Sequence, residues 1–266
     1  QEFRARRDQL IQQMGEGVAI IPTAPETIRN RDSHYPYRFD SYFYYLTGFK
    51  EPEAVLFVMA GKSPKTILFC RDKDIEREIW DGFRFGPDAA KEIFGFDEAY
   101  SIQQLDEIAP KLLANQDALF YSLGADAAWD NKVTAWLNHL RTQARTGISA
   151  PDQVLDVRKL LDEMRLIKSP FEIDLMHRSA NIAAAAHQRA MQFTKSGMME
   201  YEVEAEFLHE FYRRGAQAPA YTSIVAGGAN ACTLHYNANS AQLHDGDLLL
   251  IDAGCELAGY ASDITR

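Results

Sequence analysis

The segment at residues 247–266 constrains the fold of this 266-residue chain more than any other, because it combines a buried strand with two carboxylates. Its sequence is DLLLIDAGCELAGYASDITR. Residues 248–251 are apolar at every position, which is typical of a strand that is buried on both faces. Asp252 follows this strand directly, and Asp263 lies on a second short strand after a turn. Because an unpaired buried carboxylate costs several kcal/mol, each aspartate is expected to have a compensating partner.

The two aspartates are expected to face one another across a β-hairpin. A two-residue turn at residues 257–258 would place Asp252 directly opposite Asp263. Directly opposed residues have Cβ atoms about 4.5 to 5.5 Å apart, where like charges destabilise the pairing. Arg266 could neutralise one charge, but two converging carboxylates suit hard divalent cations, so we favour a metal site. Aspartates in hairpins are also common as turn formers and caps, and the spacing leaves that alternative open.

A histidine precedes the hairpin by about one strand. Residues 225–230, VAGGAN, predict a glycine-rich turn, and Leu234, His235 and Tyr236 follow it. His235 is a candidate for the same pocket as the aspartates, although a single histidine is more often structural than catalytic. The three cysteines are far apart with no CxxC spacing, so we interpret them as buried or incidental thiols.

Composition excludes several classes of function. The chain is 46% hydrophobic and 25% charged, as an ordinary globular protein is. Its net charge of −10 disfavours nucleic acids and anionic membrane surfaces as partners. Its apolar runs are far shorter than the roughly 20 residues that span a bilayer, and the first 14 residues lack the features of a signal peptide. We therefore expect no membrane association and a cytoplasmic location.

The length of the chain predicts two domains. The helical periodicity lapses near residues 146–151 and resumes at 154–167, and we place the domains at 1–166 and 167–266. The first is expected to be a layered α/β domain. Residues 22–49 predict a long loop with one aromatic strand around Tyr42 to Tyr45. The other elements expected in this half are strands at 18–21, 54–60, 66–71 and 118–122, and helices at 3–14, 74–80, 88–94, 102–113, 131–145 and 154–167.

The second half opens with a strong helix start. Ser169, Pro170 and Glu172 have the spacing of a capping box with proline at the first helical position. The helix is expected to run from Pro170 until before Gly197, and a second helix to follow and end at Gly215. The inward face predicted for the first helix consists of Ile173, Met176, Ala180, Ala184, His187 and Met191.

These segments resemble aminopeptidase P, the bacterial type of Xaa-Pro aminopeptidase, within the pita-bread metallopeptidases. The resemblance rests on LHYNAN at 234–239, the aspartate segment from Asp245, YTSIVAGGANAC from Tyr221 and MRLIKSPFEI from Met164. LTGFKEPEAVLF at 46–57 and EIWDGFRFGPDAA at 78–90 are similar to the non-catalytic domain of that family. The resemblance implies a creatinase/prolidase-like amino-terminal α/β domain, followed by the first part of an α+β pita-bread catalytic domain.

The resemblance also implies roles for five residues. Asp252 and Asp263 match the first two ligands of a dinuclear site, usually of Mn²⁺, with Asp263 bridging the metals. His235 matches a catalytic histidine near the scissile bond, and Tyr221 a tyrosine near the amino end of the substrate. Trp80 resembles a tryptophan that reaches the pocket of a neighbouring subunit, which implies a homo-oligomer, a dimer or tetramer. The implied activity releases the amino-terminal residue from peptides with proline at position two.

The family takes its remaining ligands, a histidine and two glutamates, from sequence beyond the position of Arg266. We therefore expect the chain as given to be an inactive fragment and assign the function to its parent enzyme. Prolidase, which cleaves Xaa-Pro dipeptides, is the alternative enzyme. A non-catalytic pita-bread module that binds peptides or proteins, or a metal-free creatinase-like hydrolase, would not need Asp252 and Asp263 to be acidic.

Overall fold

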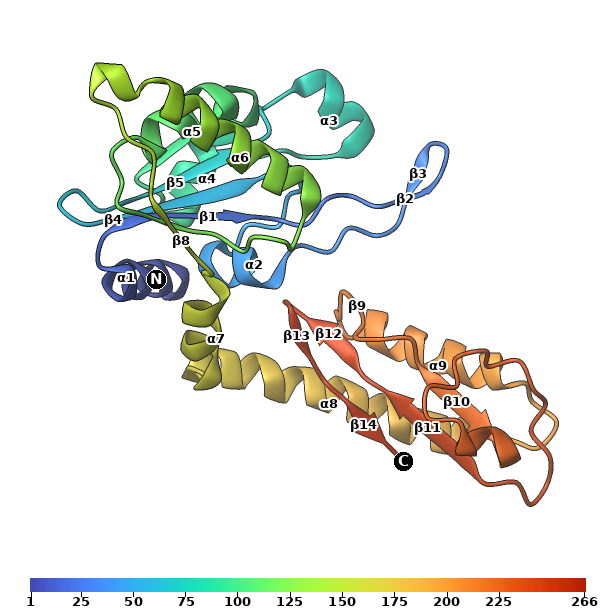
Figure 1. Cartoon of the computed structure of the whole chain (residues 1–266). Coiled ribbons are helices and arrows are strands. Elements are labelled where there is room, and N and C mark those ends of the chain that lie inside the picture. Colours follow the sequence, from blue (N-terminus) through green and yellow to red (C-terminus); the bar gives the residue numbers. More distant parts are fainter. The chain divides into compact units, whose positions relative to one another are not determined.

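The computed structural model describes residues 1–266, which form two compact units, Gln1–Ile167 and Lys168–Arg266 (Figure 1). The first unit is built on one six-stranded mixed sheet with the order β6-β5-β4-β1-β7-β8. β4 pairs antiparallel with β1 and β5, and the other neighbours are parallel. The strands are β1 (Gly17–Pro22), β4 (Val55–Ala60), β5 (Lys65–Cys70), β6 (Glu98–Ser101), β7 (Ala118–Phe120) and β8 (Gln153–Leu155).

Helices cover both faces of this sheet (Figure 1). Alternate residues of β1 supply the two cores: Ala19 and Ile21 face one core, and Val18 and Ile20 face the other. The first core is closed by α1 (Glu2–Met14), α2 (Ser41–Thr47), α4 (Gly86–Phe94) and α7 (Arg158–Leu166), and the second by α5 (Leu105–Leu113) and α6 (Ala127–Thr142). The predicted layered α/β architecture is confirmed. The smaller elements are β2 (Ile28–Asn30), β3 (Ser33–His34), α3 (Ile75–Asp81), η1 (Ile102–Gln104) and η2 (Ala144–Thr146).

The prediction of an aromatic strand around Tyr42 to Tyr45 is wrong, because these residues lie in α2. The Asp40 side chain caps this helix by accepting a hydrogen bond from the Phe43 N–H at 2.8 Å. Gly48 ends it in the left-handed conformation, with φ of 68°. Both caps are visible in the sequence, and they outweigh the strand preference of the aromatic residues between them.

The predicted helix at 154–167 begins too early. Val154 and Leu155 belong to β8 and pair with Leu119 and Phe120 of β7. The α7 helix starts at Arg158. The N–H of this residue donates a hydrogen bond to the Asp156 carboxylate at 3.0 Å. The two apolar residues therefore complete the edge of the sheet.

The second unit packs two helices, α8 (Pro170–Phe193) and α9 (Glu200–Arg213), against two small sheets (Figure 1). One sheet has the order β10-β11-β14, and the other β13-β12-β9. All neighbouring strands in both sheets are antiparallel. The strands are β9 (Ala218–Pro219), β10 (Ile224–Gly227), β11 (Leu249–Ala253), β12 (Cys255–Leu257), β13 (Tyr260–Ala261) and β14 (Ile264–Thr265), with η3 (Gly228–Cys232) after β10.

The helix start predicted at Pro170 is confirmed, but the predicted inward face of this helix is mostly wrong. Ser169 and Glu172 form the expected capping box. Ile173, Met176 and Met191 are exposed, and only His187 of the predicted face is buried. The buried positions of the helix are Glu172, Leu175, Ser179, Ile182, Ala183, Ala186, His187 and Ala190. The run of four alanines at 183–186 gives the helix apolar residues on more than one side, so the pattern did not fix which side faces the core.

Replacing Ser169 with alanine is expected to lower the free energy of unfolding of the second unit by about 1 kcal/mol, the usual value of an N-cap hydrogen bond. All three tryptophans, Trp80, Trp129 and Trp136, lie in the first unit, so their fluorescence follows that unit alone. Urea unfolding followed by circular dichroism should shift while the tryptophan transition stays in place. Ser196→Ala, an exposed serine between the two helices, is the control, and an equal shift in both variants would contradict the capping role.

None of the helices has the length and apolar character needed to cross a membrane.

Candidate metal and active site

The hairpin that carries the two aspartates has a different register from the one predicted. Its turn is at Ala258 and Gly259, which take φ of 50° and 81°, and Leu257 pairs with Tyr260. Two positive φ values are typical of the tight turns that match the twist of paired strands. Asp252 consequently lies opposite Thr265. The turn predicted at 257–258 would have placed it opposite Asp263. Because the register differs by two residues and side chains alternate with a period of two, both aspartates still belong to the same face.

The backbone between β11 and β12 passes unusually close to the segment between β13 and β14, which contains Asp263. A Cβ built on Gly254 would lie 1.7 Å from the carbonyl oxygen of Ser262. The next residue, Cys255, also contacts Ser262: its N–H donates a hydrogen bond to the Ser262 hydroxyl at 3.1 Å. Gly254 is thus required for space, and its lack of a side chain lets the segment before Asp263 approach the end of β11.

The hydroxyl group of Tyr221 joins the two carboxylates. Its oxygen lies 2.5 Å from Oδ1 of Asp252 and 3.0 Å from Oδ1 of Asp263. Burial raises the pKa of Tyr221, and the hydrogen bonds to both carboxylates raise this pKa further. The hydroxyl therefore keeps its proton at neutral pH and shares it between two negative oxygens. The predicted convergence of Asp252 and Asp263 is present in the structure, although not as a directly opposed pair.

The aspartates line a cavity of about 370 Å³ in the second unit. His235 and Tyr221 line it as well, so the structure brings together four of the five residues singled out from the sequence. Its complete lining is Tyr221, Thr222, Ile224, His235, Asn237, Asp252 and Asp263. A larger cavity of about 1040 Å³ between α5 and α6 of the first unit has none of these residues. The smaller cavity is the candidate site because its carboxylates converge.

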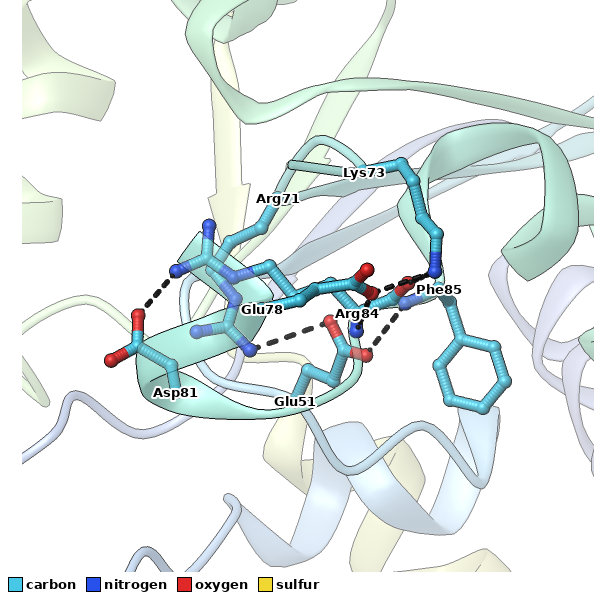
Figure 2. A network of polar contacts seen from close by, with 7 residues as sticks. All are labelled: Glu51, Arg71, Lys73, Glu78, Asp81, Arg84 and Phe85. Atoms are coloured by element: carbon cyan, nitrogen blue, oxygen red, sulfur yellow. Dashed lines mark hydrogen bonds and ion pairs between the residues drawn. The ribbon is translucent and has the colours of Figure 1, made fainter. Parts of the chain in front are cut away.

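Trp80 is not among the residues that line this cavity; it lies on α3 of the first unit, with 85% of its surface exposed. A polar network holds the segment that carries it (Figure 2). The Glu78 carboxylate accepts from the Lys73 ammonium and from the Arg84 N–H, each at 2.6 Å, and both contacts lower the pKa of Glu78. Glu51 accepts from the Phe85 N–H at 2.9 Å. The network also includes a hydrogen bond from the Lys73 ammonium to the Arg84 carbonyl at 3.0 Å, and ion pairs between Arg71 and Glu51 and between Arg84 and Asp81.

Sequence reasoning missed Glu200 and Asn239, which hold the loop around His235. Glu200 is fully buried at the start of α9, and its carboxylate accepts hydrogen bonds from residues at both ends of that loop. Asn239 is buried. Its side chain accepts a hydrogen bond from the Val225 N–H in β10 and donates one to the Ser223 carbonyl. The partners of Glu200 lie 27 to 41 residues away, so its local sequence carried no signal. Asn239 was part of the LHYNAN motif but had no role assigned.

The donor set fits part of a divalent-cation site. Two carboxylates with one hydroxyl between them offer the oxygen ligands that hard divalent cations prefer. The 266 residues gather no group of three or more histidine, cysteine or acidic side chains that could hold a metal alone. Zinc sites, for comparison, take three or four ligands from the protein. The salt-bridge alternative finds no support, because the Arg266 guanidinium donates to the Thr265 carbonyl and forms no ion pair with either aspartate.

Comparison with known proteins extends over the whole chain. Residues 3–121 match the family "Aminopeptidase P, N-terminal domain", and residues 174–266 match "Metallopeptidase family M24". The chain is 46% identical over 269 residues to the Xaa-Pro aminopeptidase of Escherichia coli K12, covering 100% of this chain and 61% of the relative. It is 34% identical to human Xaa-Pro aminopeptidase 3, of which it covers 54%.

Solved structures agree in fold with both units. Zn-substituted E. coli aminopeptidase P in complex with product is similar with a TM-score of 0.97 and 46% identity, covering 100% of this chain and 61% of that one. Pseudomonas aeruginosa aminopeptidase PepP is similar with a TM-score of 0.98 and 48% identity, covering 100% of this chain and 60% of that one. The expected fold, an aminopeptidase P amino-terminal domain and part of a pita-bread domain, is confirmed. The chain spans about 60% of the length of these relatives.

Proposed function

We propose, for a chain that belongs to the aminopeptidase P group of the M24 metallopeptidases, that the complete protein is a metal-dependent Xaa-Pro aminopeptidase. The proposed reaction releases the amino-terminal residue from peptides with proline at position two. The observation that carries this proposal is the convergence of Asp252 and Asp263 on the Tyr221 hydroxyl, in the cavity that His235 also lines. The alternatives without a metal give no reason for two negative charges to meet there.

Asp252 and Asp263 are the residues that would hold two divalent cations, Mn²⁺ in our proposal, with Asp263 shared between them. When bound, such a pair supplies Lewis-acid chemistry and an activated water for hydrolysis. The zinc in a structure of the E. coli relative supports a divalent ion at this kind of site. The missing ligands, a histidine and two glutamates, would come from sequence outside these 266 residues.

The other residues of the cavity act on the peptide. His235 is exposed at the cavity and can donate a hydrogen bond to the carbonyl oxygen of the scissile bond as negative charge develops on it. The Tyr221 hydroxyl, which keeps its proton, orients the two carboxylates, and we assign Tyr221 to the amino end of the substrate. Together these groups position the bond before proline without needing a side-chain nucleophile.

We further propose a homo-oligomer, a dimer or tetramer, in the cytoplasm. The exposure of Trp80 on a segment fixed by the Glu78 and Glu51 contacts supports a role for this tryptophan at a neighbouring subunit (Figure 2). The net charge of −10 disfavours nucleic acids, and we propose peptides as the partners.

Cleavage assays on the complete, Mn²⁺-loaded protein test this function. We expect hydrolysis of an Xaa-Pro-Yaa tripeptide before proline and no hydrolysis of the matched Xaa-Ala-Yaa control. Cleavage of Xaa-Pro dipeptides alone would identify a prolidase instead. Absence of both bound metal and cleavage would favour the non-catalytic peptide-binding module and would contradict the proposal.

A further inference from the structure

The loop that carries His235 is organised around one buried carboxylate, that of Glu200. Oε1 of Glu200 accepts from the Gly227 N–H at 2.8 Å and from the Asn230 side-chain amide at 3.1 Å. Oε2 accepts from the Tyr236 hydroxyl at 2.7 Å and from the Ala241 N–H at 2.9 Å. One side chain therefore fixes the start, the middle and the end of the segment at residues 227–241.

Glu200 achieves this as a buried charge without a cation. None of the ion pairs of the chain includes Glu200, and its carboxylate is fully buried. Burial raises the pKa of Glu200, but the hydrogen bonds from Gly227, Tyr236, Ala241 and Asn230 outweigh it and lower the pKa overall. Its place at the first residue of α9 adds the favourable field of a helix amino terminus. The carboxylate is thus ionised and fully hydrogen-bonded.

A second anchor acts on the same loop. The Asn239 side-chain carbonyl accepts from the Val225 N–H at 3.0 Å, and its amide donates to the Ser223 carbonyl at 2.8 Å. The amide also donates to the Glu204 carboxylate, one turn after Glu200 on α9. Between these two anchors the His235 side chain is exposed and lines the cavity, with Tyr236 beside it in sequence bound to Glu200.

We propose that Glu200 is a positioning residue whose buried carboxylate fixes the loop at residues 227–241 and thereby places the His235 imidazole at the cavity. This inference rests on the proposed function, in which His235 contacts the substrate. A misplacement of about 1 Å at a catalytic group can cost about 100-fold in rate, so the accuracy of this loop matters for turnover.

Glu200→Gln in the complete, metal-loaded protein tests the inference. Glutamine keeps the shape of the glutamate side chain but replaces one acceptor oxygen with an NH₂ donor. Each oxygen of Glu200 accepts from two donors, so the new NH₂ group would face two donors and lose both hydrogen bonds. We expect kcat for an Xaa-Pro-Yaa peptide to fall about 100-fold, with little change in KM and with unchanged metal content. Glu206→Gln is the matched control, because Glu206 lies on the same helix but pairs with Arg189 and not with the loop. Its kcat should stay near that of the wild type.

A double-mutant cycle with His235→Ala separates positioning from a general loss of stability. If Glu200 acts through His235, adding Glu200→Gln to His235→Ala should lower kcat little further. If the fold-losses in kcat of the two single variants multiply in the double variant, the inference is overturned. A Glu200→Gln variant with wild-type kcat would overturn it as well. Should Glu200→Gln fail to fold, Tyr236→Phe removes one of the four contacts of Glu200, together with the bond from the Asn230 amide to the same hydroxyl. It should give a smaller fall in kcat that also disappears in the His235→Ala background.

An NMR readout distinguishes failure of this inference from failure of the proposed function. The imidazole resonance of His235 in the complete protein should shift or broaden in Glu200→Gln, while that of His139 in the first unit stays unchanged. This result would support the positioning role even if the wild-type protein cleaved no Xaa-Pro peptide. An unmoved His235 resonance would contradict it whatever the activity.

Discussion

Asp263→Asn in the complete protein is expected to lose bound metal and peptidase activity together. Asp263 and Asp252 place their Oδ1 atoms around one hydroxyl, and an asparagine amide carries no charge and cannot bridge two cations. Metal ions contribute several kcal/mol to hydrolysis, so activity should fall by about three orders of magnitude. The measurement is metal content by mass spectrometry on the purified protein, alongside kcat for an Xaa-Pro-Yaa peptide.

Asp245→Asn is the matched control for this prediction. Asp245 precedes β11, the strand that carries Asp252, and it is exposed and does not line the cavity. The control should keep both its metal and its activity. Full metal content in Asp263→Asn would remove the bridging role that we assign to this aspartate.

Gly254→Ala is expected to destabilise the second unit by about 3 kcal/mol or more, a value typical of severe overpacking. The added methyl group would lie 1.7 Å from the Ser262 carbonyl oxygen, and a backbone atom cannot move away as a side chain can. The segment before Asp263 must shift, so metal binding by the complete protein should weaken as well. Urea unfolding followed by circular dichroism measures the loss, with tryptophan fluorescence reporting the first unit as an internal reference.

Gly227→Ala provides the comparison, because its methyl group would meet the flexible end of the Leu243 side chain at 2.6 Å. That side chain can rotate, so Gly227→Ala should cost less than Gly254→Ala. Equal losses in the two variants would mean that the close backbone approach at Gly254 does not limit the stability of the hairpin.

The sequence predicted most of the first unit and the start of the second. The layered α/β arrangement follows from apolar strands that alternate with amphipathic helices, and the capping box of Ser169 and Glu172 is a local signal that requires no tertiary information. The error at Tyr42 to Tyr45 arose because aromatic residues favour strands, whereas the helix is set by Asp40 and Gly48 at its ends.

The candidate site was predicted less completely. The prediction of the hairpin register was wrong because Ala258 occupies a left-handed conformation that alanine rarely adopts. The sequence therefore did not indicate the position of the turn. The two aspartates nevertheless share a face, since an error of two residues leaves the side-chain alternation intact. Glu200 could not be found in this way, because its function depends on partners that only the folded chain brings together.

Anomalous diffraction from crystals of the complete protein grown with Mn²⁺ tests the central claim most directly. The account predicts two manganese peaks about 3.5 to 4 Å apart, with oxygens of Asp252 and Asp263 about 2.0 to 2.3 Å from them. Asp263 should contact both peaks. Crystals that bind manganese elsewhere, or that show no manganese within ligand distance of either carboxylate at saturating metal, would contradict the assignment of these aspartates as ligands.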